Sequence, residues 1–304
     1  MLADADFRPV RLEDRDFFAD HYARYPQEHS DNTFTNMVCW NHYAFYEYAY
    51  IRGSVVLRST IGGRTRYRPP IGPDDPELLA DVIVCAGRDG DDIALAILGE
   101  RARAAVTAAY PSLPLEPVRD YFEYVYLASD LANLPGKRYL KIRNQLNRFR
   151  RNCNYSIGAV GSESLADVEE FLLEWCDWKD CEGNPILENE KAAILYAIHH
   201  FSEIGLSGIG VRVDGRVAAI ALYERLNADT ALVHFEKGLP DCEGIYKAVN
   251  TATAKTLVDG HRFINRESDL GDPGLREAKQ RYHPHHMVEA YRVYRDDLLN
   301  LGAT

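Results

Sequence analysis

The sequence lacks any segment typical of a secretory leader and any apolar run long enough to cross a membrane. It begins MLADADFRPVRLED, without the basic and apolar parts of a signal peptide. No run approaches the roughly 18–20 uninterrupted apolar residues of a spanning helix. We therefore expect a soluble, cytoplasmic protein without an integral membrane segment, for which peripheral membrane contact stays open.

Cysteine is scarce and shows no metal-binding or redox spacing. There are six cysteines and no C-x-x-C pair. Scattered cysteines in a chain without a leader favour reduced core thiols over disulfides or zinc ligands. The six are Cys39, Cys85, Cys153, Cys176, Cys181 and Cys242.

Positive charge is also in deficit, since the formal net charge is −11. Such a balance argues against a protein that coats nucleic acid nonspecifically, although it leaves room for a local basic patch. The 304 residues, 46% of them apolar, are enough for one large core or two ordinary ones, and we expect two domains.

The C-terminal half shows the clearer pattern of strands and helices. Its predicted order is β-α-α-β-β-β-α-β-α-β, and Asp214-Gly215 between two apolar runs predicts a hairpin turn. We expect strands at 155–160, 209–213, 217–223, 231–235, 261–265 and 288–294, and helices at 165–179, 189–204, 245–258 and 273–281.

The N-terminal half repeats this order more loosely. We expect strands at 7–10, 43–50, 55–60, 65–68, 93–98 and 122–127, and helices at 13–24, 77–86 and 100–109. A polar stretch at Ala128–Gly136 suggests the boundary, so the predicted domains are 1–130 and 131–304, the second beginning with a linking helix at 137–152. The predicted class is α+β. The element order resembles the GNAT acyltransferase fold, and two copies resemble tandem aminoacyl-tRNA-dependent transferases.

The linking helix is strongly basic. Lys137–Arg151 carries seven cations and no acid. On a helical period the apolar side chains share one face, which can dock on a core. The cations would form a positive stripe for the phosphates of RNA or of a lipid headgroup. Alternatively, they pair with the protein's own acids. The apolar face is Tyr139, Ile142, Leu146 and Phe149, and the candidate acids are Glu163, Asp167, Glu169 and Glu170.

A predicted strand ends in a possible reaction site. His234 and Glu236 alternate along it, so they face the same side, and either could act as a general base. Lys237, Arg266 or Lys279 could stabilise an oxyanion. The helix after Gly244 would offer free N–H groups to an anion. Alternatively, the charged strand residues merely pair across the sheet.

Other motifs give weaker signals. Asp269 and Asp272 lie in the segment Asp269-Leu-Gly-Asp-Pro-Gly, which lacks calcium-loop spacing, so they favour turn-forming or capping roles. The histidines at 283–286 lack a ligand spacing, so we expect neither metal nor bound cofactor. The segment Lys237–Gly244 lacks the Q/R-x-x-G-x-G/A pattern of a CoA pyrophosphate loop and carries two acids. No nucleophile motif is present, so direct attack on a bound acyl donor fits better than covalent catalysis.

Seven motifs are spread over most of the chain. They are Ser30-Asp-Asn-Thr-Phe-Thr-Asn36 with Trp40, Tyr124-Val-Tyr-Leu, Leu134-Pro-Gly-Lys137, Lys141-Ile-Arg-Asn144-Gln-Leu-Asn147-Arg-Phe149, His234-Phe-Glu-Lys237, Gly244-Ile-Tyr246-Lys-Ala-Val-Asn250 and the segment from Asn265 through Arg276 and Lys279 to Tyr282. Together they resemble the phosphatidylglycerol lysyltransferase C-terminal-domain-like family.

The resemblance implies a tandem GNAT-like fold and transfer of an aminoacyl group from aminoacyl-tRNA to a lipid-headgroup or small-molecule acceptor. The family's Asp-Leu-Met-Arg motif appears here as His234-Phe-Glu-Lys237, which leaves acceptor and aminoacyl identity open. An acyl-CoA-dependent N-acyltransferase, less favoured, and a non-catalytic ligand-binding module are the alternatives. The expected catalytic residues are Glu236, His234, Lys279 and Arg266. The expected substrate-binding residues are Lys137, Lys141, Arg143, Asn144, Asn147, Arg148, Lys237, Tyr246, Asn250, Asn265, Glu267, Asp269, Arg276 and Tyr282.

Overall fold

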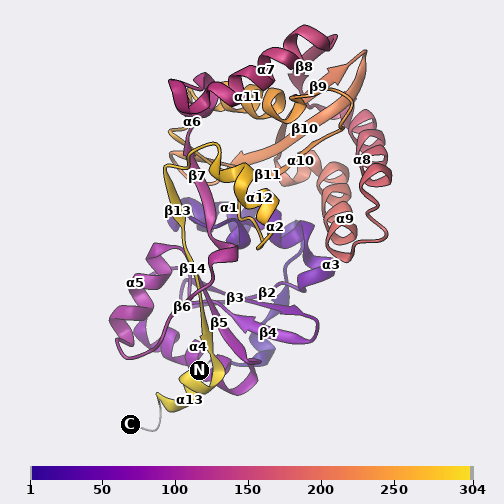
Figure 1. Cartoon of the computed structure of the whole chain (residues 1–304). Helices are drawn as coiled ribbons and strands as arrows, with labels where there is room; N and C mark the ends of the chain where they lie inside the picture. The colour runs from indigo at the N-terminus through magenta and orange to yellow at the C-terminus, as the bar shows by residue number, and fades with distance from the viewer. Residues whose placement is uncertain (1, 302–304) are drawn as a thin grey trace. The chain divides into compact units, whose positions relative to one another are not determined.

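Two seven-stranded sheets, each mixed in strand direction, organise the computed structural model, which describes residues 2–301 (Figure 1). The chain divides into two units. Unit 1 contains the chain up to Glu123, Ser268–Asp272 and the chain from Val288, and unit 2 contains Tyr124–Glu267 and Pro273–Met287. No helix in the described residues is long and apolar enough to cross a membrane.

The sheet of unit 1 has the order β1-β2-β3-β4-β5-β14-β6, in which β4 and β5 run parallel. Its strands are β1 (Arg8–Pro9), β2 (Glu47–Ile51), β3 (Ser54–Ile61), β4 (Arg64–Tyr67), β5 (Ile93–Leu98), β6 (Glu116–Pro117) and β14 (Ala290–Tyr294). Its helices are α1 (Arg15–Arg24), α2 (Phe34–Cys39), α3 (Asn41–Ala44), α4 (Pro76–Asp89), α5 (Glu100–Ala109) and α13 (Arg295–Asn300).

Helix α4 shows how the sequence builds the core of unit 1. Its apolar residues recur at three- and four-residue spacing, and Leu78, Val82 and Ala86 are buried in one cluster with Leu95 of β5. The helix begins where the Asp75 side chain accepts a hydrogen bond from the Leu78 N–H, with Pro76 as its first residue.

The sheet of unit 2 has the order β13-β7-β12-β11-β10-β9-β8, in which β11 and β12 run parallel. Its strands are β7 (Glu123–Leu127), β8 (Tyr155–Ala159), β9 (Ser207–Val213), β10 (Arg216–Arg225), β11 (Thr230–Gly238), β12 (Phe263–Asn265) and β13 (His286–Val288). Its helices are α6 (Ala128–Asn133), α7 (Leu140–Asn152), α8 (Leu165–Lys179), α9 (Pro185–His199), α10 (Phe201–Ile204), α11 (Ile245–Leu257) and α12 (Pro273–Gln280). The hairpin turn is confirmed, because Asp214 and Gly215 have φ of 49° and 85°.

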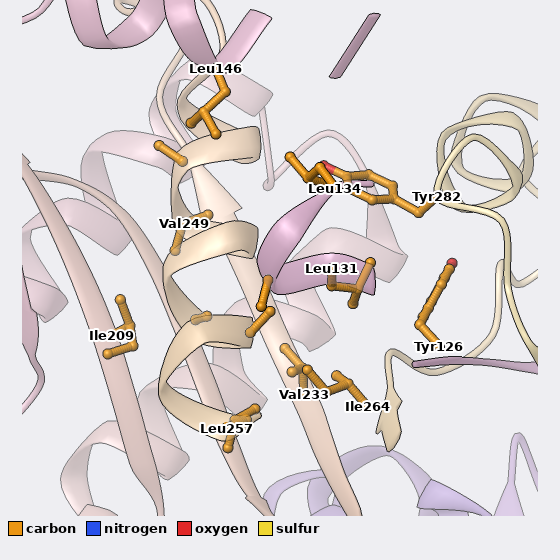
Figure 2. Packing of buried hydrophobic residues seen from close by; sticks show 14 of the residues in the cluster. Tyr126, Leu131, Leu134, Leu146, Ile209, Val233, Val249, Leu257, Ile264 and Tyr282 are labelled. Carbon is orange, nitrogen blue, oxygen red and sulfur yellow. The ribbon is translucent and has the colours of Figure 1, made fainter. Parts of the chain in front are cut away.

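Helix α11 is the centre of the core of unit 2. Figure 2 shows its Val249 and Leu257 among side chains from α6, α7 and the sheet, including Leu131, Leu146 and Val233. The basic helix α7 buries Ile142, Leu146 and Phe149, which confirms its predicted apolar face. The two helices approach closely at Gly244, where an added Cβ would lie 2.5 Å from the carbonyl oxygen of Gln145.

The two observed units do not match the predicted domain boundary at residue 130. Strand β14, expected in the second domain, pairs with β5 in the sheet of unit 1, whereas β7, expected in the first, pairs with β12 in unit 2. The polar stretch expected to be a linker begins with helix α6, whose Leu131 and Ala132 are buried. Strand pairing over long sequence distances decides these assignments, and local composition does not reveal it.

The expectation of six reduced cysteines is wrong for four of them. Disulfides join Cys153 to Cys242 and Cys176 to Cys181, while Cys39 and Cys85 are free and buried. The first pair is separated by 89 residues and meets only because the end of α7 packs beside the segment before α11. Spacing along the chain therefore carried no signal for it.

Candidate functional site

The candidate site lies where β11 runs on beyond its parallel partner. Strand β12 pairs with β11 at Thr230, Ala231 and Leu232 only, so the last part of β11 leaves the β12 side open for side chains. On its other side β11 pairs with β10, and a register shift leaves His234 as the extra residue of a bulge. Bulges re-aim side chains, and they are common beside active sites.

Glu236 and Arg266 form a shielded ion pair at this place. The Nη2 group of Arg266 donates to Oε1 of Glu236 at 2.7 Å, and the two side chains are 13% and 11% exposed. Asn250 of α11 donates from Nδ2 to the other carboxylate oxygen at 3.1 Å. Both oxygens of Glu236 are thus oriented by donors, which fixes the carboxylate. We call Glu236, Arg266, Asn250, Lys247 and Tyr282 the Glu236 cluster.

Lys247 completes this cluster, and sequence reasoning missed it. Its ammonium lies 4.9 Å from the centre of the Tyr282 ring, and the Arg266 guanidinium lies 5.0 Å from the same ring. Burial lowers the pKa of Lys247, Arg266 lowers it further, and Glu236 opposes the shift. The signal was present in the sequence, because Lys247 and Asn250 are three residues apart and share a helix face.

Two polar atoms of the cluster are buried without a hydrogen-bond partner among the described residues. They are Nη1 of Arg266, a donor, and Oδ1 of Asn250, an acceptor. Leaving a buried polar group unpaired costs about 1–3 kcal/mol, so such atoms need an explanation. A donor and an acceptor left open beside one carboxylate are what a polar ligand requires.

His234 does not join the Glu236 cluster and lies between two other acids. Its Nε2 lies 2.8 Å from Glu224 and its Nδ1 lies 3.0 Å from Glu267, while its side chain is 2% exposed. Burial by itself would lower the pKa of His234, but the hydrogen bonds and charges of the two glutamates outweigh it and raise the pKa to about 10. An imidazolium donates from both nitrogens and has no lone pair for a proton, so this geometry argues against His234 as the base.

Lys279 supports the backbone beneath the site. Its Nζ donates to the carbonyl oxygens of Arg266 and Glu267, the latter at 3.0 Å. It is buried, and its ammonium lies 5.7 Å from the centre of the Tyr124 ring. This position does not offer the oxyanion contact expected of Lys279. Asn265 also supports this backbone, because its Oδ1 accepts a hydrogen bond from the Glu267 N–H at 2.8 Å. Glu267 has a φ of +56°.

Lys237, expected at the site, points to α8 and α9. Its Nζ lies 2.7 Å from Glu190 and 4.5 Å from the centre of the Trp175 ring. Burial raises the pKa of Tyr246, and the charges of Glu236 and Glu190 add to the rise. Lys237 therefore makes its ion pair with α9 and not with the Glu236 cluster.

Two further expected residues fall outside the cluster. Asp269 belongs to unit 1, where it accepts from Arg119 at 3.3 Å and from the Gly271 N–H at 3.0 Å, in agreement with the turn-forming role. Arg276 lies in α12, partly exposed. Within residues 2–301, no three histidine, cysteine, aspartate or glutamate side chains gather as metal ligands.

The basic helix keeps part of its charge free. Arg143 donates to the carbonyl oxygens of Leu134 and Gly136, so it holds the start of the helix. Arg138 pairs with Asp130 at 2.6 Å and Arg148 pairs with Glu243 at 2.8 Å. Four exposed cations have no acidic partner in the described chain, namely Lys137, Lys141, Arg150 and Arg151.

The acids expected to neutralise this helix do not do so. Asp167 pairs with Arg212 and Glu169 with His199. Asn144 and Asn147 are exposed on α7 beside the cations. The start of the helix is also joined to the Glu236 cluster, because the Tyr139 hydroxyl donates to the Tyr282 carbonyl oxygen at 3.0 Å.

Comparison with known proteins gives a family. The model of the family described as "Phosphatidylglycerol lysyltransferase, C-terminal" matches residues 22–294. No curated protein sequence matches the chain.

Solved structures share the fold. A conserved protein of unknown function from Bacteroides thetaiotaomicron is 30% identical, with a TM-score of 0.87 over 95% of this chain and 98% of that one. L-PGS from Bacillus licheniformis is 14% identical, with a TM-score of 0.65 over 95% and 93%. A tandem GNAT protein from the clavulanic acid biosynthesis pathway is 12% identical, with a TM-score of 0.52 over 95% and 98%. The chain therefore has two GNAT-like domains, as the element order predicted.

Proposed function

Because the chain belongs to the phosphatidylglycerol lysyltransferase C-terminal family, we propose that it is an aminoacyltransferase whose reaction takes place at the Glu236 cluster. The donor in this proposal is an aminoacyl-tRNA, and the acceptor is a hydroxyl or amine of a lipid headgroup or small molecule. The observation that carries the proposal is the shielded Glu236–Arg266 pair, with Arg266 Nη1 and Asn250 Oδ1 open beside it.

Glu236 is the base in this scheme. Its carboxylate, held by Arg266 and Asn250, takes the proton of the acceptor O–H or N–H as the acceptor attacks the ester carbonyl of the donor. Arg266 Nη1 and Lys247 are the cations that stabilise the oxyanion of the tetrahedral intermediate. The intermediate then breaks its bond to the terminal ribose oxygen of the tRNA, and that oxygen takes the proton from Glu236.

The basic helix is the donor-binding surface in the proposal. Its four unpaired cations can contact tRNA phosphates, and Tyr139 at its start is bonded to the Tyr282 backbone of the cluster. Lys237 and Tyr246 border the acceptor. A tRNA donor places the reaction in the cytoplasm and requires no bound cofactor. CoA is disfavoured because the segment before α11 lacks the pattern of a CoA pyrophosphate loop and carries two acids, Asp241 and Glu243.

Transfer can be measured with a total tRNA pool charged with radiolabelled amino acids, using phosphatidylglycerol vesicles and, separately, small amines as acceptors. We expect label in an acceptor with charged tRNA and none with labelled acetyl-CoA. Glu236→Gln should lower the rate by about 100-fold or more, because a positioned base contributes about 10²–10⁴. Glu170→Gln, at an exposed position of α8, is the matched control. An unchanged rate in Glu236→Gln, or transfer from acetyl-CoA alone, contradicts the proposal.

A further inference from the structure

Unit 1 contains a groove that no part of the proposed transfer uses. It has a volume of about 540 Å³ and lies between the segment after β4, from Arg68 to Pro76, and helix α5. The α5 side is formed by Arg101 and by small side chains, including Ala102, Ala105 and Ala109. Leu79 and Leu98 add larger apolar surface, so most of the groove is lined by carbon.

The wall opposite α5 is held in place. Ile71 exchanges two backbone hydrogen bonds with Val55, at 2.8 and 2.9 Å, and its carbonyl oxygen lies 2.7 Å from Nε2 of His21. Prolines at 69, 70, 73 and 76 restrict the backbone of the same segment. A rigid wall reduces the entropy that a ligand must overcome on binding.

A buried arginine lies at the polar end of the groove. Arg68 is 5% exposed, and its Nη1 donates to the Asp31 carbonyl oxygen at 2.5 Å and to Asn32 Oδ1 at 2.8 Å. Its guanidinium also lies 5.2 Å from the centre of the Tyr46 ring. Within the described chain no carboxylate pairs with Arg68, and its Nε and Nη2 make no hydrogen bond. A charge buried without a counter-ion is costly, so this site favours an anion.

Two of the three acids along the groove are already engaged. Glu28 accepts from the Glu100 N–H at the start of α5, at 2.8 Å, and Asp75 caps α4. Asp74 is exposed. We infer that the groove is a second ligand site, which takes a molecule with a carboxylate or phosphate head on Arg68 and a narrow aliphatic body along the alanines of α5. Arginine suits both heads, because its fork of donors matches two oxygens at once.

The test is a binding titration of the full chain with four probes. They are octanoate, octyl phosphate, octanol without a charge, and inorganic phosphate without a chain. We expect octanoate, octyl phosphate or both to bind saturably. A probe that binds should do so at least about tenfold more tightly than octanol and than inorganic phosphate. A charge-assisted hydrogen bond and a buried chain each contribute affinity on that scale. The preferred head tells a carboxylate ligand from a phosphate ester. No saturable binding, or octanol equal to both anions, overturns the inference.

Variants locate the binding. Arg68→Gln should weaken the preferred anion by about tenfold or more. Because Arg68 is buried and this variant could unfold, Ala105→Glu supplies a second arm, which places a negative charge on an exposed position of the groove. Thr107→Glu is its matched control, exposed on α5 but outside the groove. Equal binding in Ala105→Glu and Thr107→Glu overturns the assignment. The readout is binding, so it is independent of whether the protein transfers aminoacyl groups.

Discussion

The two units use one framework with different chemistry after the parallel strand pair. In unit 1 the pair is β4 and β5, and the residue that follows β4 is Arg68, a buried cation without an acid. In unit 2 the pair is β11 and β12, and Glu236 faces Arg266 and Asn250. The difference shows that the fold provides the position, while the side chains decide between an anion site and a site that can also move a proton.

The helices α4 and α11 also differ between the units, in how their N-termini are capped. In unit 1, the N-terminus of α4 is closed by the Asp75 side chain and by Pro76. In unit 2, α11 begins at Gly244 with no side-chain cap, and its first turn carries Lys247. The first helix is capped by a side chain, whereas the N–H groups of Ile245 and Lys247 at the start of the second donate to the backbone carbonyls of Cys242 and Gly244. The second helix also carries a cation, Lys247, in its first turn, which is available to a ligand.

Removing the charge of Lys247 in α11 should have the largest effect on this contrast between the units. Lys247→Met keeps the length of the side chain and removes the charge, so we expect the transfer rate to fall by about 100-fold, the scale of losing one oxyanion donor. The matched control is Lys255→Met, an exposed lysine on the same helix, which should change the rate less than twofold. If both variants transfer equally well, Lys247 has no part in the reaction.

The next largest effect is expected from the unpaired cations of α7 and of the turn before it. Replacing Lys137, Lys141, Arg150 and Arg151 by glutamine should weaken tRNA binding by about tenfold or more at low salt. It should also flatten the plot of log affinity against log salt by roughly 0.7–0.9 for each phosphate that α7 no longer neutralises. A fourfold control in unit 1, at Arg11, Arg15, Arg24 and Arg66, changes the net charge equally. Equal salt slopes in the two variants would show that tRNA does not recognise α7.

The sequence predicted most of the elements because their patterns are local. Helix α8 spans the predicted residues, and α11 and the β9–β10 hairpin differ from theirs by a few. The predicted elements are wrong where packing overrides the local sequence preference. The aromatic run 43–50 predicts one strand, yet its first residues, 43 and 44, belong to α3, which ends at Ala44. The next residue, Phe45, has a φ of +42°. Aromatic residues favour strands by packing, which a helix end can also satisfy.

The site was predicted only in part, for a similar reason. Motif and alternation brought Glu236, Arg266, Asn250 and Tyr282 into one group, and the structure places them together. The alternation along the strand wrongly placed His234 beside Glu236. A bulge in β11 and contacts with Glu224 and Glu267 decide the position of His234, and sequence spacing does not encode them. Lys247 was missed because a lysine in a helix is ordinarily exposed.

Histidine makes a third contrast between the units, in the pH dependence of stability. The pKa of His234 is raised from 6.5 to about 10, so its contribution is complete below pH 6.5 and is lost as the pH rises through 10. Burial lowers the pKa of His21 in unit 1, so its contribution is lost instead as the pH falls below 6.5. We expect His234→Gln to remove about 3 kcal/mol of the wild-type loss in unfolding free energy between pH 7 and 10.

Urea unfolding at a series of pH values measures this contrast, with His21→Asn as the counterpart variant. His21→Asn should leave the alkaline side unchanged and flatten the acid side. A wild-type protein as stable at pH 10 as at pH 7 would mean that His234 is not held as an imidazolium, and would make it a candidate base again.

The last expected effect, on stability alone, concerns the glycine that opens α11. Gly244 has a φ of +93°, and an added Cβ would lie 2.5 Å from the Gln145 carbonyl oxygen, so Gly244→Ala must strain the backbone and also separate α11 from α7. Gly136 has a φ of +72° with nothing within 4 Å of an added Cβ, so Gly136→Ala costs the backbone strain alone, about 1 kcal/mol. We expect Gly244→Ala to lower the unfolding free energy by roughly 2–3 kcal/mol, as measured by denaturant titration. Equal losses in the two variants would mean that α11 can move away from α7 at no cost. The close approach of the two helices would then not be what positions Lys247 and Asn250.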